Sequence, residues 1–401
     1  MKRSIISKAI LLFIAISIGQ VTIAQDKEKK EGYKFKTKYE APYTSVKNQY
    51  RSGTCWSFAG IAFLESEILR KTGDTTDLSE MYVVRNVYPE KAKKYVRFHG
   101  SCNFAGGGGF SDVLWSVDQY GIVPEDNYKG LNYGEENHVH GELDAVLKSY
   151  ANAIIKNKNK KLSTAWYKGF NNIIDTYLGE KPESFTYKGQ TYTPKSLQEK
   201  YDINPDDYIE ITSYNHHPFY SEFILEIPDN WMLSKYYNVP LEDLIKITKH
   251  ALKKGYAVGW DADVSDKGFS HSKGLAILPD TQKEDLSGTE KEKWEKLTSK
   301  EKRNALYSFD KPVKEKEITQ ESRQKDFDNY SATDDHLMLF TGVAKDQNRN
   351  EYFIVKNSWD TGNKYDGFFY ASTPYVKDKT ISILIHKDAL PKKIRKKLNI
   401  K

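Results

Sequence analysis

The sequence predicts an α+β fold, with a helical half early in the chain and a sheet-rich half late in it. Two observations lead to this class. Apolar residues between positions 55 and 70 recur near the 3.6-residue period of a helix, and Gly73 follows as a stop. Residues 336–356 instead hold two apolar runs around a polar turn, which is typical of a β-hairpin. A chain of 401 residues can bury a sizeable core without disulfides.

The remaining elements are expected from the same periodicities and from glycine and proline breakers. Four consecutive glycines, Gly106 to Gly109, interrupt the helical half. Residues 281–328 are dominated by charged side chains and are expected to form exposed helices and loops. Helices are expected at residues 78–98, 111–120 and 241–252, and strands at residues 256–260 and 274–278.

The first 24 residues have the pattern of a secretory signal peptide. Lys2, Arg3 and Lys8 surround the start of a short apolar run, and Ala24 ends a stretch of small residues suited to cleavage. The run falls well short of the ~20 apolar residues that a membrane span needs, so a membrane anchor is the weaker alternative. The protein is therefore expected to be exported, periplasmic or secreted, with no stable membrane insertion after cleavage.

The net charge gives no reason to expect a nucleic-acid partner. The formal charge is +6, and three of the positive charges lie in the expected signal peptide. A mild positive surplus spread over a long chain differs from the clustered basic patch that nucleic-acid binding requires.

Cys55 is the candidate nucleophile. It stands where the helix is expected to begin, so the unpaired N–H groups of the first turn can stabilise its thiolate. Gly53 lets the backbone turn sharply into that helix. Gln49, six residues earlier, supplies an amide N–H that can hold an oxyanion together with the backbone N–H of Cys55. Taken alone, a cysteine in an apolar helix is more often a small buried hydrophobe.

The predicted hairpin supplies a base for this thiol. Its first run begins at His336 and its second run ends just before Asn357, with the polar turn 345–350 midway between them. A symmetric antiparallel pairing therefore places His336 opposite Asn357. The asparagine carbonyl can then accept from one imidazole nitrogen, which leaves the other nitrogen for the thiol.

The chain resembles the papain-like cysteine peptidases in the order of four motifs, which are Gln49, Cys55-Trp56, Asp335-His336 and Asn357-Ser358-Trp359. This resemblance implies a two-lobed fold, with Cys55 on a helical lobe, His336 and Asn357 on an antiparallel β-sheet lobe, and the substrate cleft between them. It also implies that Trp359 shields the His–Asn pair from water. By the same resemblance, the glycine-rich loop lines the cleft and binds an extended peptide at Gly108, Gly109 and Phe110.

Within that family the chain is most similar to bleomycin hydrolase and aminopeptidase C. The wide separation of Cys55 from His336 requires a large insertion, which is expected to be mainly helical and to span roughly residues 130–240 of a peptidase domain over 25–401. The subgroup resemblance implies a homohexamer. In that subgroup the C-terminal tail lies in the cleft and restricts cleavage to the amino end of the substrate. The tail here, residues 390–401, differs from the usual ending.

The expected function is hydrolysis of peptide substrates by a Cys–His–Asn mechanism, as an aminopeptidase, without a metal or organic cofactor. Two alternatives stay open. One is an endopeptidase with an open cleft. The other is a non-catalytic peptide-binding or scaffold protein that keeps the fold.

Two further features were weighed for other roles. Ser52 stands where many secreted papain-like enzymes have a cysteine that pairs near the glycine-rich loop, so the resemblance implies that Cys102 is a free, buried thiol. His138-Val-His140 and His216-His217 lack the carboxylate and the i, i+4 spacing of a zinc-hydrolase helix. They are expected to be surface or structural histidines, and no metal site is predicted.

Overall fold

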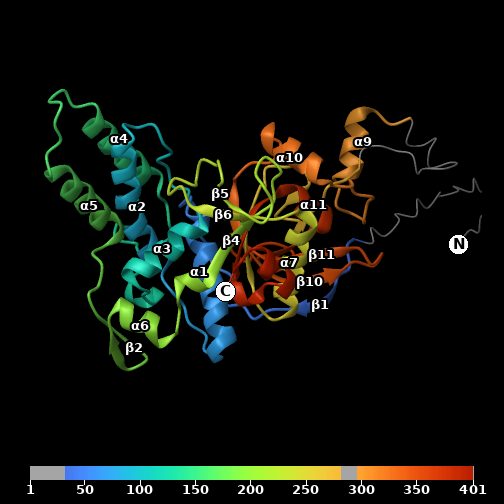
Figure 1. Ribbon diagram of the computed structural model, residues 1–401, viewed down its shortest axis with the longest axis horizontal. Coiled ribbons are helices and arrows are strands. Elements are labelled where there is room, and N and C mark those ends of the chain that lie inside the picture. The colour runs from blue at the N-terminus through green and yellow to red at the C-terminus, as the bar shows by residue number, and fades with distance from the viewer. Residues whose placement is uncertain (1–31, 281–295, 401) are drawn as a thin grey trace, which may run out of the picture. The chain divides into compact units, whose positions relative to one another are not determined.

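Residues 32–280 and 296–400 are described by the computed structural model of the chain, and the signal peptide expected at residues 1–24 lies outside them. The α+β prediction is confirmed. Helix α1 (Cys55–Thr72) lies between a group of helices on one side and a large sheet on the other (Figure 1). None of the described helices is both long enough and apolar enough to span a bilayer.

The helical lobe is built around α1 as the sequence predicts. Gly73 ends α1 in the left-handed region (φ 73°), and the Ser79 side chain caps the next helix by accepting from the Tyr82 N–H. The apolar faces of these helices share one core. The lobe contains α2 (Glu80–Arg97), α3 (Phe110–Tyr120), α4 (Gly141–Ile155), α5 (Ala165–Leu178) and α6 (Pro194–Lys200).

The described strands of the sheet lobe follow the order β5-β6-β4-β13-β7-β10-β11-β12-β9-β8, and β1 pairs with β10. Pairing is antiparallel except between β4 and β6 and between β9 and β12. Helix α7 (Leu241–Lys253) packs on β10. The strands are β1 (Lys36–Glu40), β4 (Tyr208–Thr212), β5 (Glu222–Ile224), β6 (Lys235–Asn238), β7 (Val258–Ala262), β8 (Phe269–Ser270), β9 (Leu275–Ala276), β10 (His336–Lys345), β11 (Glu351–Lys356), β12 (Phe368–Ser372) and β13 (Thr380–His386).

The hairpin of β10 and β11 is confirmed, but the symmetric register expected for it is wrong. Leu339 pairs with Lys356, so the same register places Asn357 opposite Met338 and not opposite His336. Because successive side chains of a strand point to opposite faces, an offset of two residues keeps His336 on the face that Met338 occupies. The two side chains can therefore still meet.

The turn and a bulge together set this offset: beside the turn Lys345 pairs with Glu351, three residues from the expected register, and an irregularity between Phe340 and Gly342 brings the offset back to two. The Asp346 carboxylate accepts from the backbone N–H groups of Asn348 and Asn350, at 2.9 Å each. The Asp346 N–H donates to the Asn350 carbonyl at 3.0 Å and closes a tight loop over residues 346–350. The centre of the turn thus lies later in the chain than the middle of the whole polar stretch.

Residues 130–240 are helical only in their first part, so the expectation of a mainly helical insertion is too simple. Helices α4 to α6 belong to the helical lobe, and a small hairpin of β2 (Phe185–Tyr187) and β3 (Gln190–Tyr192) lies between α5 and α6. Strands β4, β5 and β6 then join the main sheet, with β4 pairing to β13. The alternation of apolar and polar residues within Tyr208–Thr212 is the local reason why this segment forms a strand.

The C-terminal tail packs on the α7 side of the sheet. Helix α12 (Lys392–Lys397) buries Ile394, and Leu398 follows it into the same core as α7. Cys55 belongs to the other core, on the α1 side. The described part of the tail therefore does not occupy the position beside the nucleophile that the subgroup resemblance implies.

The charged stretch late in the chain is only partly exposed where it is described, because Arg323 is fully buried and donates to the Ser213 carbonyl at 2.8 Å. Helices α9 (Ser299–Leu306) and α10 (Gln320–Asp328) are short, and residues 281–295 lie outside the described part of the chain. Another short helix of the sheet lobe, α11 (Thr373–Lys379), leads directly into β13.

Candidate active site

The structure places Cys55 at the first position of α1, as the sequence predicts. Its side chain is buried, with 9% of the residue exposed. Burial raises the pKa of the thiol to about 12, while the backbone N–H of Leu337 acts in the opposite direction. The helix start alone therefore does not make a thiolate here, because the loss of solvent outweighs it.

His336 and Asn357 are brought together. The imidazole Nε2 lies 2.7 Å from Asn357 Oδ1, which fixes the ring and leaves Nδ1 as its second nitrogen. The Trp359 ring stacks on the imidazole at 4.5 Å between centroids, so it covers the pair as the resemblance implies. His271, which the sequence reasoning missed, lies 3.3 Å from Asn357 Nδ2 through its Nδ1 and thus holds the far side of the amide.

The thiol and the imidazole are both neutral in this arrangement. Burial lowers the pKa of His336 to about 4, although the hydrogen bond to Asn357 acts against that shift. In the described contacts no hydrogen bond joins the Cys55 thiol to His336. Cys55 of α1 and His336 of β10 nevertheless lie near each other. The backbone N–H of Leu337, the residue directly after His336, is close enough to lower the pKa of the thiol. Burial thus favours the uncharged forms of both groups before substrate binds.

Gln49 is held by a residue of the Asn-Ser-Trp motif. Its backbone N–H donates to the Ser358 carbonyl at 2.8 Å, and its Oε1 accepts from Ser358 Oγ at 2.7 Å. This orientation leaves the Nε2 group of Gln49 as the side-chain donor. The role of Ser358 was not expected, although its place directly after Asn357 was part of the motif.

Two buried side chains hold the glycine-rich loop by its carbonyl groups. Trp56 Nε1 donates to the Gly106 carbonyl at 2.9 Å, and Lys91 Nζ donates to the carbonyls of Ala105 and Gly107. A Cβ at Gly108 would lie 2.4 Å from Asp112 Oδ2, so only glycine fits there. Nothing in the sequence indicates that Lys91 is buried against this loop, because a lysine on a helix is ordinarily solvated.

Two of the three residues predicted to bind peptide on this loop are occupied in other ways. The Gly109 N–H donates to Asp112 Oδ2 at 3.2 Å as part of the α3 cap, so that donor is used within the protein. Phe110 is fully buried and packs against Gly259 of β7. The prediction that Phe110 lines the substrate site is therefore wrong. An aromatic after a glycine run can equally well be a core residue.

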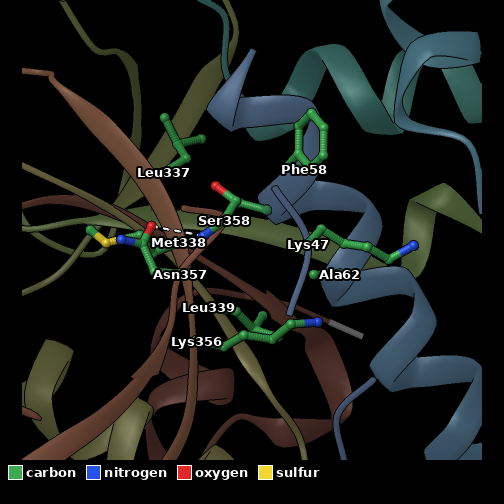
Figure 2. Close-up of a pocket in the computed structure, with 10 residues that line it drawn as sticks. Lys47, Phe58, Ala62, Leu337, Met338, Leu339, Lys356, Asn357 and Ser358 are labelled. Carbon is green, nitrogen blue, oxygen red and sulfur yellow. Dashed lines mark hydrogen bonds between the residues drawn. The ribbon is translucent and has the colours of Figure 1, made fainter. Parts of the chain in front are cut away.

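A small pocket lies behind Asn357, between α1 and the ends of β10 and β11 (Figure 2). Lys356 reaches into this region, and its Nζ donates to Thr44 Oγ1 at 3.0 Å. Burial lowers the pKa of Lys356 to about 8, while the nearby Glu65 carboxyl acts against that shift. The backbone N–H of Ser358 donates to Asn357 Oδ1 at 2.8 Å. This polar junction fixes the end of β11 and hence the asparagine.

The remaining expectations have mixed outcomes. Cys102 is a free thiol, as expected, but it is only partly buried. The argument that His216 and His217 lack a carboxylate partner is wrong, because the fold brings Glu226 to 3.2 Å from His216 and 3.4 Å from His217. These hydrogen bonds, together with one between Gln324 and the other ring nitrogen of His216, explain why the three side chains lie close together.

We expect Gln49→Ala to reduce kcat for peptide hydrolysis by about 10²- to 10³-fold, because one donor to the developing oxyanion is lost. KM should change little, since that donor acts mainly on the transition state. Steady-state kinetics on a fluorogenic peptide would measure both constants. A loss confined to KM would contradict the assigned role of Gln49.

Histidine burial also predicts a pH effect on stability. His140 is fully buried, and burial lowers its pKa to about 4 from an ordinary value of 6.5. The unfolded chain therefore takes up a proton between pH 6.5 and 4 that the folded chain does not, so His140 destabilises the fold progressively as the pH falls through this window. Relative to wild type, His140→Asn should become more stable by about 2 kcal/mol between pH 7 and pH 5. Urea unfolding at both pH values would measure it, and a constant difference would contradict the reasoning.

Comparison with known proteins agrees with this geometry. Residues 33–217 match the model of the papain family cysteine proteases, and residues 302–401 match that of the peptidase C1-like family. Aminopeptidase C of Listeria monocytogenes is 21% identical, over 90% of this chain and 84% of the relative. Aminopeptidase E of Lactobacillus helveticus is 23% identical, over 87% of this chain and 82% of the relative.

A solved structure supports the fold. PepW from Lactobacillus rhamnosis HN001 superimposes with a TM-score of 0.67 at 19% identity, covering 91% of this chain and 84% of that one. The chain therefore has a papain-like fold, and its residues 33–217 match the papain family of cysteine proteases. Among such peptidases, its full-length similarity is to the aminopeptidase C subgroup.

Proposed function

We propose that the protein is an exported aminopeptidase in which Cys55 is the nucleophile, His336 the base, Asn357 the orienting group and Gln49 part of the oxyanion hole. The observation that carries this proposal is the 2.7 Å contact between His336 Nε2 and Asn357 Oδ1 beside a cysteine at a helix start. The names of the full-length relatives, aminopeptidase C and aminopeptidase E, support the aminopeptidase part.

The reaction proceeds in two halves. His336 Nδ1 takes the proton of Cys55 as the sulfur attacks the carbonyl carbon of the substrate, and the oxyanion is held by Gln49 Nε2 and the Cys55 N–H. His336 then protonates the leaving amine, and the C–N bond breaks to leave a thioester. Water attacks the thioester and gives its proton to His336, which returns it to the sulfur as the acid product leaves.

Hydrolysis of two matched fluorogenic substrates tests this function. One carries a leucyl group with a free amino end, and the other carries the N-acetylated form. Both are incubated with the mature protein under reducing conditions. Cleavage of the free form only would support an aminopeptidase, and cleavage of longer blocked peptides would support an endopeptidase. The absence of cleavage of either substrate would support a non-catalytic scaffold.

Export and assembly belong to the same proposal. The support for export is the pattern of Lys2, Arg3, the apolar run and Ala24. Amino-terminal sequencing of the protein from a native extract would find Gln25 first if cleavage follows Ala24. The subgroup resemblance supports a homohexamer, and light scattering at a mass of one chain would overturn that part alone.

A further inference from the structure

Three carboxyl groups beside Cys55 have no part in the mechanism above. Asp229, Asp261 and Asp334 each lie close enough to act on the thiol electrostatically. They come from separate parts of the chain, because Asp229 lies between β5 and β6, Asp261 lies in β7, and Asp334 comes just before β10. Their convergence on the nucleophile is thus a product of the tertiary fold.

Asp229 lies directly against the glycine-rich loop. Its Oδ1 accepts from Asn103 Nδ2 at 2.7 Å, and a Cβ added at Gly107 would lie 2.0 Å from its Oδ2. The neighbouring Gly106 lies close to the carbonyl of Gly53, two residues before Cys55. A peptide that lies along this loop with its first carbonyl at the sulfur therefore has the Asp229 carboxylate within reach of its amino end.

The loop that carries Asp229 is firmly held. Trp231 is 5% exposed, and its Nε1 donates to Asp112 Oδ2 at 2.8 Å. Asn230, also 5% exposed, closes the loop by donating to the Leu225 carbonyl at 2.9 Å and accepting from the Ser234 N–H at 2.8 Å. The position of Asp229 over the glycine-rich loop is thus fixed by the side chains of the two residues that follow it.

Behind Asp229, the carboxyl groups of Asp261 and Asp334 contact each other, and burial raises the pKa of both, that of Asp334 to about 7, so the pair shares a proton and has no opposing cation among the described residues. Asp261 is 3% exposed, and its Oδ1 has no hydrogen-bond donor among the described residues; Asp334 Oδ2 has none either. Lys91 acts on Asp229, but its Nζ already donates to two backbone carbonyls of the loop. Buried carboxyl oxygens without donors are costly, so a ligand that brings N–H donors and positive charge is favoured here.

We propose that Asp229, with Asp261 and Asp334 behind it, binds the free α-ammonium group of the substrate and restricts cleavage to its amino end. This inference rests on the proposed function. An ammonium group brings three N–H donors and one positive charge, whereas an acylated amino end brings neither the charge nor the donors. The C-terminal tail cannot supply this selection from its place, since Ile394 and Leu398 hold it in the α7 core.

The kinetic test uses Asp229→Asn, which removes the charge and keeps an oxygen for the bond from Asn103. We expect kcat/KM for the leucyl substrate with a free amino end to fall about 100-fold, mainly through KM, because a close charge pair is lost. Activity on blocked peptides should be unchanged or raised. Asp118→Asn, which removes a carboxylate from the exposed side of α3, is the matched control and should behave as wild type.

A binding test separates this inference from the proposed function. Leucinamide and N-acetyl-leucinamide are titrated into Cys55→Ala by calorimetry, so no turnover is needed. We expect leucinamide alone to bind, and the additional Asp229→Asn substitution to abolish that binding. Peptide hydrolysis failing while leucinamide still binds would overturn only the proposed function.

Three results would overturn the inference itself. The first is equal binding of both amides to Cys55→Ala. The second is an Asp229→Asn enzyme that keeps wild-type selectivity for free amino ends. The third is preferential cleavage of blocked peptides that carry arginine or lysine two residues before the cleaved bond. That result would mean that the carboxyl groups bind a basic side chain of the substrate. If Cys55→Ala does not fold, inhibition of wild-type turnover by leucinamide and by N-acetyl-leucinamide compares the binding of the two amides instead.

Discussion

Cys55→Ala is expected to lower kcat/KM for peptide hydrolysis by at least about 10⁴-fold, because no other described side chain near His336 can form the thioester. The alanine variant should keep its fold, since the residue fills a helix start where alanine is well tolerated. Progress curves at high enzyme concentration would measure the residual rate, and far-UV circular dichroism would verify the fold.

The second cysteine offers a matched control for this result. Cys102 is a free thiol that is only partly buried, and it lies outside the proposed catalytic group. Cys102→Ala should therefore retain wild-type kinetics. Loss of activity in Cys102→Ala, with Cys55→Ala still active, would mean that the nucleophile has been misassigned.

Gly121→Ala is expected to destabilise the fold by about 3 kcal/mol or more. Gly121 ends α3 with φ 82°, a region that residues with a Cβ rarely adopt. An added Cβ would also lie 2.4 Å from the backbone carbonyl of Pro194 at the start of α6, where the backbone cannot easily move away. Urea unfolding followed by fluorescence would measure the change.

Gly362 serves as a control that separates backbone strain at Gly121 from the general effect of replacing glycine with alanine. Gly362 has no positive φ, and a Cβ there would meet nothing within 4 Å. Gly362→Ala should therefore leave the free energy of unfolding unchanged within about 0.5 kcal/mol. Equal stability losses in both variants would contradict the explanation for Gly121.

The sequence was sufficient for those parts of the site that depend on local structure. Cys55 at a helix start follows from helical periodicity and from Gly53, and these are features of neighbouring residues. The meeting of His336 with Asn357 also follows from a hairpin, although the turn and a bulge together shift the register by two residues. The expectation survives this error because strand side chains repeat every two residues.

The parts that could not be predicted depend on contacts between distant segments. Asp229 reaches Gly107 only because β5 and β6 join the main sheet, and nothing near Asp229 in the sequence indicates that pairing. The same holds for Lys91, whose burial comes from the loop folded over it. The wrong prediction for Phe110 has another origin. A family motif implies an exposed aromatic side chain there, whereas packing against Gly259 buries it.

The resting state of Cys55 has a consequence for the lifetime of the enzyme. Peroxide and other electrophiles attack cysteine as the thiolate, and a buried thiol with a pKa of about 12 presents almost none of that form. Burial therefore slows the reaction of Cys55 with such reagents while the site holds no substrate. Burial is the larger cause of this raised pKa, and the charges of Asp229, Asp261 and Asp334 add to it, so an ammonium group bound beside them would lower the pKa of the sulfur only in part.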